Sequence, residues 1–173
     1  MQSLYKEQGE QVDIIDLAKV GLSEVDGAHY SANQPVSMQD AIKKVTAADG
    51  IIVVVPEYNG SMPGALKYFI DHWKYPDTFE FRPICLIGLG GRFGALRAVE
   101  HLQGVFGYRN GFIYPERVFL TDVAKTIVNG EVQNPMILNL LRSQTQNFSK
   151  FVSALQGAKL DANSVNSQKT AAK

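Results

Sequence analysis

Residues 51–67 read IIVVVPEYNGSMPGALK, and this stretch decides the fold. Its first five residues are apolar and β-branched, which is typical of a central strand covered on both faces in a parallel sheet. Two prolines, two glycines, an asparagine and a serine follow and predict a loop. Apolar residues then recur at helical spacing, at Leu66, Phe69, Ile70 and Trp73. The order is strand, loop and helix, and open α/β sheets bind ligands in loops that leave the carboxyl ends of their strands.

The rest of the chain alternates between strand-like and helix-like segments. Strands are expected near residues 12–16, 84–88 and 112–120, and helices near residues 37–49, 63–73, 95–106 and 134–155. Ser37 and Asp40 resemble a capping box, and Asn134 before Pro135 is a favourable helix start. Strands that alternate with helices predict an α/β protein with a doubly wound parallel sheet.

Length and composition are those of one globular domain. The chain has 173 residues, of which 45% are hydrophobic and 20% charged. We expect the domain to span residues 1–157, and the small, polar residues 158–173 to form a disordered tail. The 17 basic and 17 acidic residues include no long basic run, which argues against nucleic-acid binding. No apolar segment approaches the roughly 20 residues of a membrane span, so we expect a cytoplasmic protein without membrane contact.

Other familiar chemistries fit the chain poorly. His29, His72 and His101 are far apart in the sequence and lack metal-ligand spacing, so no metal site is predicted and solvated or hydrogen-bonded histidines are expected. The single Cys85 lies in a short apolar run and is interpreted as a core residue. A Gly-x-Ser-x-Gly elbow of the hydrolase type is absent from the sequence, and we assign no catalytic side chain.

Three stretches resemble a known family. Residues 56–73, PEYNGSMPGALKYFIDHW, resemble the signature of the NADPH-dependent FMN reductases, a flavodoxin-like group that includes quinone, azo-dye and chromate reductases. Residues 88–98, GLGGRFGALRA, are similar to that family's other loop on the flavin side, and residues 129–132, NGEV, are similar to its late turn. The resemblance covers residues 12–155 and implies a flavodoxin-like, three-layer sheet.

The resemblance fails at the amino end of the chain. The family has a first strand and then a loop, rich in glycine and serine, that holds the FMN phosphate, and neither is found here. The missing strand would lie between the strands expected at residues 12–16 and 50–55, so its loss leaves apolar sheet edges unpaired. Two interpretations stay open. Either Met1 is an internal or misassigned start, or another chain or a rearrangement fills the gap.

The first loop is the expected cofactor site. A flavin needs a flat slot, hydrogen bonds to the polar edge of its ring and little water at its reactive nitrogen. Pro56 ends the strand, Gly60 allows close approach of the backbone, and Asn59 and Ser61 offer short polar groups.

Two further residues of this loop allow more than one interpretation. The resemblance places Glu57 beside the flavin, where positioning is preferred to acid–base catalysis, but a glutamate at a strand end is often solvated or salt-bridged. Tyr58 is assigned to the ring or to a subunit contact, and ordinary packing is its alternative.

The second loop supplies the remaining predicted cofactor residues. Gly90 and Gly91 keep it thin enough to lie against the flavin, and Arg92 attracts phosphates of a nicotinamide donor or of the flavin, or is simply exposed. A Rossmann fingerprint is a weaker interpretation, because Phe93 stands where its third glycine is required.

The resemblance implies an FMN-dependent oxidoreductase. It would take hydride from NADPH or NADH and reduce a small-molecule acceptor, namely a quinone, an azo compound, free flavin or a metal oxyanion. The family is typically dimeric or tetrameric, so a homodimer or homotetramer is expected, with Tyr68, Phe69 and Trp73 suited to the interface. The alternative function is a flavodoxin-like binding or structural subunit that has lost its phosphate loop and catalyses nothing.

Overall fold

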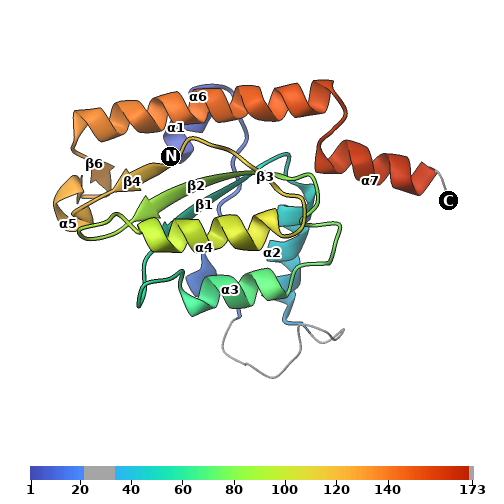
Figure 1. Ribbon diagram of the computed structural model, residues 1–173, viewed down its shortest axis with the longest axis horizontal. Coiled ribbons are helices and arrows are strands. Elements are labelled where there is room, and N and C mark those ends of the chain that lie inside the picture. The colour runs from blue at the N-terminus through green and yellow to red at the C-terminus, as the bar shows by residue number, and fades with distance from the viewer. Residues whose placement is uncertain (22–33, 172–173) are drawn as a thin grey trace.

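The computed structural model describes residues 1–21 and 34–171. Its elements in chain order are α1 (Gln2–Lys6), the short 3₁₀ helix η1 (Leu17–Lys19), α2 (Val36–Ala47), β1 (Ile51–Pro56), α3 (Gly64–Asp71), β2 (Pro83–Leu89), α4 (Leu96–Gly107), β3 (Phe112–Ile113), β4 (Val118–Leu120), α5 (Val123–Thr126), β5 (Ile127–Val128), β6 (Glu131–Val132), α6 (Pro135–Gly157) and α7 (Ala162–Ala171). Helices lie above and below the main sheet, and β5 and β6 form a separate antiparallel pair (Figure 1).

The main sheet is parallel and centres on β2. Strand β1 pairs with β2 from Ile51 opposite Ile84 to Pro56 opposite Leu89. On the other edge, β3 pairs with the start of β2 and β4 with its end, so the last predicted strand is split in two. Pro115 lies in the break, as expected of a residue that cannot donate to a ladder. The predicted parallel α/β arrangement is confirmed.

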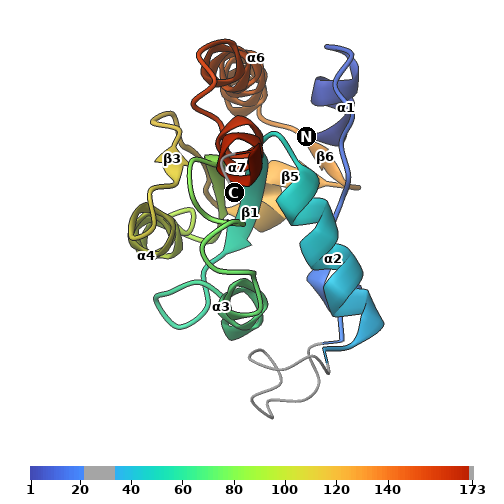
Figure 2. The same cartoon turned by 90° about the vertical axis from the view of Figure 1, so that its right-hand side faces the viewer.

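Two helical layers cover the sheet. Ile84 and Leu86 of β2 pack with α2, α3 and α4 in one cluster of buried residues, whereas Cys85 and Ile87 face α1 and α6. This alternation is what a strand buried on both faces requires. The end-on view in Figure 2 shows α1 and α6 on one side of the sheet and α3 on the other.

Strand β1 is an edge strand, not the central strand that its apolar run predicted. Among the described residues it pairs only with β2, and the side chain of Val54 is 45% exposed. A continuous β-branched run indicates that the faces of a strand are buried, and Val53 and Val55 of β1 are buried. The run does not indicate whether the strand has a hydrogen-bonded neighbour on each edge.

The strand predicted at residues 12–16 is not formed. Val12 packs beside the cluster under α6, whereas Ile15 and Leu17 pack beside the cluster on the opposite side of the sheet. The segment therefore crosses the sheet edge without joining a ladder, and Ile14 is 63% exposed. The Asp16 carboxylate accepts a hydrogen bond from Ala18 N at 3.1 Å and starts η1. Apolar periodicity was present, but a strand also needs a hydrogen-bonding partner.

The predicted helix starts have different outcomes. Asn134 caps α6, since its Oδ1 accepts hydrogen bonds from Met136 N at 3.0 Å and Ile137 N at 3.4 Å. The capping box at Ser37 is wrong. Helix α2 begins one residue earlier, after Pro35, and the Ser37 hydroxyl accepts a hydrogen bond from Gly21 N at 3.0 Å.

The end of the chain differs from the disordered tail that its composition predicted. Residues Ala162–Ala171 form α7, whose first turn is capped by Asp161 Oδ1. Lys169 Nζ donates to Glu80 Oε2 at 2.8 Å, and the hydrogen bond with Lys169 lowers the pKa of that carboxyl. Long-range contacts of this kind, which composition does not reveal, hold α7 against the link between α3 and β2.

The end of the sheet near α7 contains a buried arginine. Arg82 is fully buried, and its guanidinium donates to the carbonyl oxygens of Thr46, Ala48 and Thr78. Burial lowers the pKa of this side chain. One cation thus joins the end of α2 to the link before β2.

Two of the aromatic residues expected at a subunit interface lie in the core instead. Phe69 and Trp73 are 4% and 6% exposed, and Trp73 stacks on Phe106 of α4 with 5.8 Å between ring centroids. The apolar stripe of α3 therefore faces its own domain.

Within the described residues, no helix is both long and apolar enough to cross a membrane.

Candidate functional site

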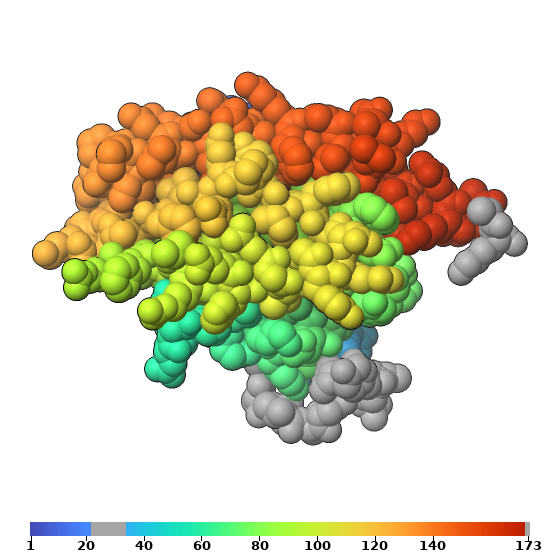
Figure 3. Space-filling view, viewed as in Figure 1, coloured from blue at the N-terminus to red at the C-terminus, as the bar shows by residue number. Residues whose placement is uncertain are grey.

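Two loops meet at the carboxyl ends of the parallel strands β1 and β2. Pro56 ends β1 and Leu89 ends β2, and these residues are ladder partners, so both loops leave the same edge of the sheet. In the space-filling view the teal and yellow-green atoms of the two loops project at the same end of the molecule (Figure 3). A cleft of about 180 Å³ lies between them, lined by Glu57, Asn59, Gly60, Gly90, Gly91, Arg92, Phe93 and Ala95.

The first loop is a tight hairpin turn. Tyr58 N donates to Ser61 O at 2.9 Å, and Ser61 N donates back to Tyr58 O at 3.1 Å. The two residues between them are left-handed, with φ of 51° at Asn59 and 75° at Gly60. This is the backbone that Asn-Gly pairs favour in two-residue hairpin turns, because asparagine and glycine tolerate positive φ. The turn presents Asn59 and Gly60 to the cleft.

Glu57 brings a polar atom into the cleft wall. Its Oε2 is enclosed and has no hydrogen-bond partner among the described residues. An enclosed, unpaired acceptor costs about 1–3 kcal/mol, and a donor from a ligand in the cleft would remove that cost. The polar edge of a flavin ring carries both an N–H donor and carbonyl acceptors, and Glu57 fits the donor. The unpaired Oε2 of Glu57 therefore fits the N–H group of FMN.

The glycines of the second loop serve two different needs. A Cβ on Gly88 would overlap the carbonyl oxygen of Gly94, and a Cβ on Gly90 would lie 2.6 Å from Ala95 N. Neither position has room for a side chain, because the loop folds tightly on itself. A Cβ on Gly91 would meet nothing within 4 Å, so Gly91 faces open space beside the cleft. Only Gly91 has the free surface that close approach of a ligand requires.

Arg92 and Phe93 form the outer wall of the cleft. Both side chains are exposed, Phe93 by 61%, and the Arg92 guanidinium lies 5.6 Å from the centre of the Phe93 ring. An exposed cation over an aromatic face is held weakly and stays available to an anion.

Six of the nine predicted site residues line the cleft, and three do not. The six are Glu57, Asn59, Gly60, Gly90, Gly91 and Arg92. Pro56 is the last residue of β1, and Tyr58 is 62% exposed outside the cleft lining. The Ser61 hydroxyl is hydrogen-bonded to His101 Nδ1 at 2.8 Å.

Sequence reasoning missed two residues that line the cleft. Phe93 and Ala95 both lie within the quoted stretch at residues 88–98, but attention to glycines and charges passed over them. The available signal was an aromatic residue, Phe93, within the glycine-rich run of residues 88–94. His101 was interpreted as solvated or hydrogen-bonded, and it lies beside the first loop with a partner.

The other polar candidates stay apart from the cleft. Burial raises the pKa of the Cys85 thiol to about 12, so at neutral pH it is not the thiolate that acts as a nucleophile. His72 is buried at the end of α3, and His29 lies outside the described residues. No group of three or more potential metal ligands occurs among residues 1–21 and 34–171.

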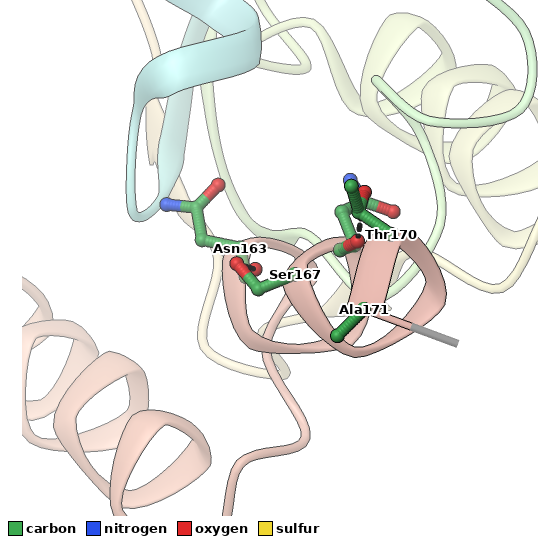
Figure 4. A pocket seen from close by; sticks show the side chains of 5 residues that line it. Asn163, Ser167, Thr170 and Ala171 are labelled. Atoms are coloured by element: carbon green, nitrogen blue, oxygen red, sulfur yellow. Dashed lines mark hydrogen bonds between the residues drawn. The ribbon is translucent and has the colours of Figure 1, made fainter. Parts of the chain in front are cut away.

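A second hollow, of about 590 Å³, lies beside α7. Asn163, Asn166, Ser167, Thr170 and Ala171 line it (Figure 4). The hydroxyls of Ser167 and Thr170 donate to the carbonyl oxygens of Asn163 and Asn166, both at 2.9 Å, so their hydrogens are already used within the helix. The hollow contains none of the predicted site residues.

A parallel sheet covered by helices on both faces, with a cleft at the carboxyl ends of its strands, defines an α/β protein of the flavodoxin-like type. Comparison with known proteins gives the family. The family model described as NADPH-dependent FMN reductase matches residues 1–126. The chain therefore belongs to the NADPH-dependent FMN reductase family, and the resemblance seen in residues 56–73 and 88–98 is confirmed.

Individual relatives agree with this assignment. The FMN-dependent NADPH-azoreductase of Staphylococcus aureus strain USA300 is 30% identical over 124 residues, which are 68% of this chain and 64% of that protein. The match thus spans less than two thirds of the relative's length.

Solved structures show the same fold. The flavoenzyme NAD(P)H:(acceptor) oxidoreductase FerB from Paracoccus denitrificans aligns with a TM-score of 0.70 and 20% identity, over 88% of this chain and 85% of its own. An oxidoreductase from Corynebacterium diphtheriae aligns with a TM-score of 0.62 and 16% identity, over 89% and 81% of the two chains.

Proposed function

We propose that this chain holds FMN in the cleft between its two loops and acts as an NAD(P)H-dependent oxidoreductase. The observation that carries the proposal is the meeting of two segments some thirty residues apart in the sequence. The stretches that resemble the flavin loops of the family form the two walls of one cleft at the carboxyl ends of β1 and β2.

Each residue of the cleft makes a different contact with the cofactor. Glu57 Oε2 accepts a hydrogen bond from an N–H at the polar edge of the ring. Asn59 adds a short amide at the tip of the hairpin, and Gly91 offers an open backbone surface. Bound FMN supplies the redox chemistry, accepting hydride from the nicotinamide and giving electrons to the acceptor.

The outer wall serves the two exchanging substrates. Arg92 attracts the phosphates of NADPH or NADH, and its exposed guanidinium suits a ligand that must leave again. Phe93 limits water at the mouth of the cleft. The cleft is smaller than the roughly 300–1,000 Å³ that enclose whole small molecules, so it holds an edge of the ring and leaves one side open. An open side suits planar or small acceptors: a quinone, an azo compound, free flavin or a metal oxyanion.

The proposal for assembly is an analogy with the family, and the proposal for location comes from the sequence. We propose a cytoplasmic homodimer or homotetramer. The exposed Tyr58 at the hairpin is a candidate contact residue, in place of the buried Phe69 and Trp73.

The test is cofactor binding followed by turnover. The chain, purified under native conditions, is titrated with FMN and with lumiflavin, which carries the ring without the phosphate, and the quenching of flavin fluorescence is measured. NADPH oxidation is then followed at 340 nm with a quinone as acceptor. We expect saturable binding of both flavins and FMN-dependent oxidation. A chain that binds neither flavin and oxidises no NADPH would contradict the proposal and support a non-catalytic binding subunit.

A further inference from the structure

His101 on α4 lies against the flavin-side hairpin, and its hydrogen bond to that hairpin links the two walls of the cleft. The Ser61 hydroxyl and His101 Nδ1 are 2.8 Å apart, which is the length of a good hydrogen bond between these groups. Ser61 closes the hairpin that carries Asn59 and Gly60. Helix α4 begins at Leu96, directly after the second loop. The hydrogen bond from Ser61 to His101 therefore joins the end of the hairpin, which is one wall of the cleft, to helix α4, which follows the second loop, the other wall.

A second residue of α4, Arg97, also lies close to the hairpin. Arg97 and His101 are four residues apart on α4, so they lie on the same face of the helix. Arg97 Nη1 is 3.8 Å from the position that a Cβ on Gly60 would take. One face of α4 thus backs the hairpin at two successive turns, with a hydrogen bond at one turn and a close approach at the other.

The hairpin is rigid within itself but needs an external anchor. Its two backbone hydrogen bonds fix Tyr58 relative to Ser61, yet neither of them reaches α4 or the second loop. The second loop is tied to the following segments instead, by Gly90 N to Leu120 O at 3.0 Å and by Asp122 N to Gly91 O at 2.9 Å. The two walls are already joined at their bases, where Pro56 pairs with Leu89, so the position of the hairpin tip relative to the second loop depends on contacts beyond that ladder.

We propose that His101 is a positioning residue, which sets the width of the cleft by holding Ser61, and that flavin affinity depends on this hydrogen bond. The inference rests on the proposed function of the cleft. His101 does not need to touch the cofactor, because it acts through Ser61 and the hairpin. A slot for a planar ring gains affinity when its walls are held at the correct separation before binding.

Matched substitutions separate this role from a general effect on folding. His101→Ala removes the hydrogen bond, and His101→Asn keeps a polar atom close to the place of Nδ1. Asparagine has both a donor and an acceptor there, so it suits either direction of the bond with Ser61. His101→Gln extends toward the place of Nε2 and should not restore the contact. Glu100→Ala is the control, since Glu100 is the exposed neighbour of His101 on the same helix.

The first measurement needs no cofactor. Hydrogen exchange of the peptide covering residues 57–62 is compared between the variants and the wild-type chain. A hydrogen bond of this kind contributes about 0.5–1.5 kcal/mol, which corresponds to a loss of protection of roughly 2- to 12-fold at the Tyr58 and Ser61 amides. We expect that loss in His101→Ala and His101→Gln, wild-type protection in His101→Asn and no change in Glu100→Ala. Equal exchange in His101→Ala and the wild-type chain would overturn the proposal.

The second measurement is flavin binding. The same roughly 2- to 12-fold weakening of FMN and lumiflavin binding is expected in His101→Ala. Ser61→Ala should show a similar loss, and the double variant should lose no more than either single variant, because both substitutions remove one bond. Additive losses, or unchanged affinity in His101→Ala, would refute the link. If the wild-type chain binds no flavin, the proposed function fails by itself, and the exchange experiment still decides whether His101 holds the hairpin.

Discussion

Replacing Glu57 by methionine should stabilise the cofactor-free protein and weaken flavin binding. Glu57 Oε2 is enclosed without a partner among the described residues, so the free chain carries the desolvation cost of that oxygen. Such a cost is about 1–3 kcal/mol. Methionine has a similar length and no acceptor to satisfy, and the free energy of unfolding should rise by up to that amount. In a domain of this size, each kcal/mol corresponds to a rise in Tm of about 2–4 °C.

The effect on binding has the opposite sign. A hydrogen bond to a charged group contributes about 1.5–3 kcal/mol, so Glu57→Met should lower the affinity for FMN and for lumiflavin by about 10- to 150-fold. Urea unfolding measures the first effect and fluorescence titration the second. Glu100→Met on the exposed side of α4 is the control, and it should change stability by no more than about 0.5 kcal/mol. The reasoning is refuted if Glu57→Met destabilises the free protein, or if flavin affinity stays within twofold of the wild-type value.

Three further predictions concern the loops and the far end of the sheet. Gly88→Ala should cost about 1–3 kcal/mol in urea unfolding because its Cβ overlaps a backbone carbonyl, whereas Gly91→Ala, in open space, should change stability by less than about 0.5 kcal/mol. Arg82→Met leaves three carbonyl oxygens without their donor and should lower the free energy of unfolding by about 3 kcal/mol, and an unchanged urea midpoint would contradict this. The Glu80 pKa is below its ordinary value of 4.5, so the ion pair with Lys169 stabilises α7 above that pH and is lost as the pH falls through the lowered pKa. Amide protection at residues 162–171, measured relative to the intrinsic exchange rate at each pH, should therefore fall in acid in the wild-type chain and be insensitive to this pH range in Glu80→Gln.

Local patterns were sufficient for much of the fold and for most of the cleft. The β-branched run at residues 51–55, the Asn59-Gly60 pair and the Asn134 cap each act over a few residues, and each has the conformation that its chemistry favours. The first cleft loop was recognisable because it follows a strand, and the second because it resembles the family's other loop on the flavin side. Parallel strands bring both loops to the same edge of the sheet.

What the sequence did not reveal depends on distant partners. Residues 12–16 have the composition of a strand but no ladder partner, and the polar residues of α7 become helical through contacts such as Lys169 with Glu80. The Ser61–His101 hydrogen bond joins residues 40 positions apart. Such pairings are properties of the folded chain, and no local pattern at either residue indicates them.

The edge position of β1 affects how strongly the stability of the protein depends on its ligand. Among residues 1–21 and 34–171, β1 pairs only with β2, and a strand held on one side opens more easily than a strand held on both. The hairpin is attached to the end of this strand. A flavin lying between the two loops would clamp the end of β1 to the end of β2, and a ligand present at 100 times its Kd adds about 2.7 kcal/mol to stability. The vitamin from which FMN is made would then act as a folding aid, and we expect the protease resistance and abundance of this protein to follow riboflavin supply.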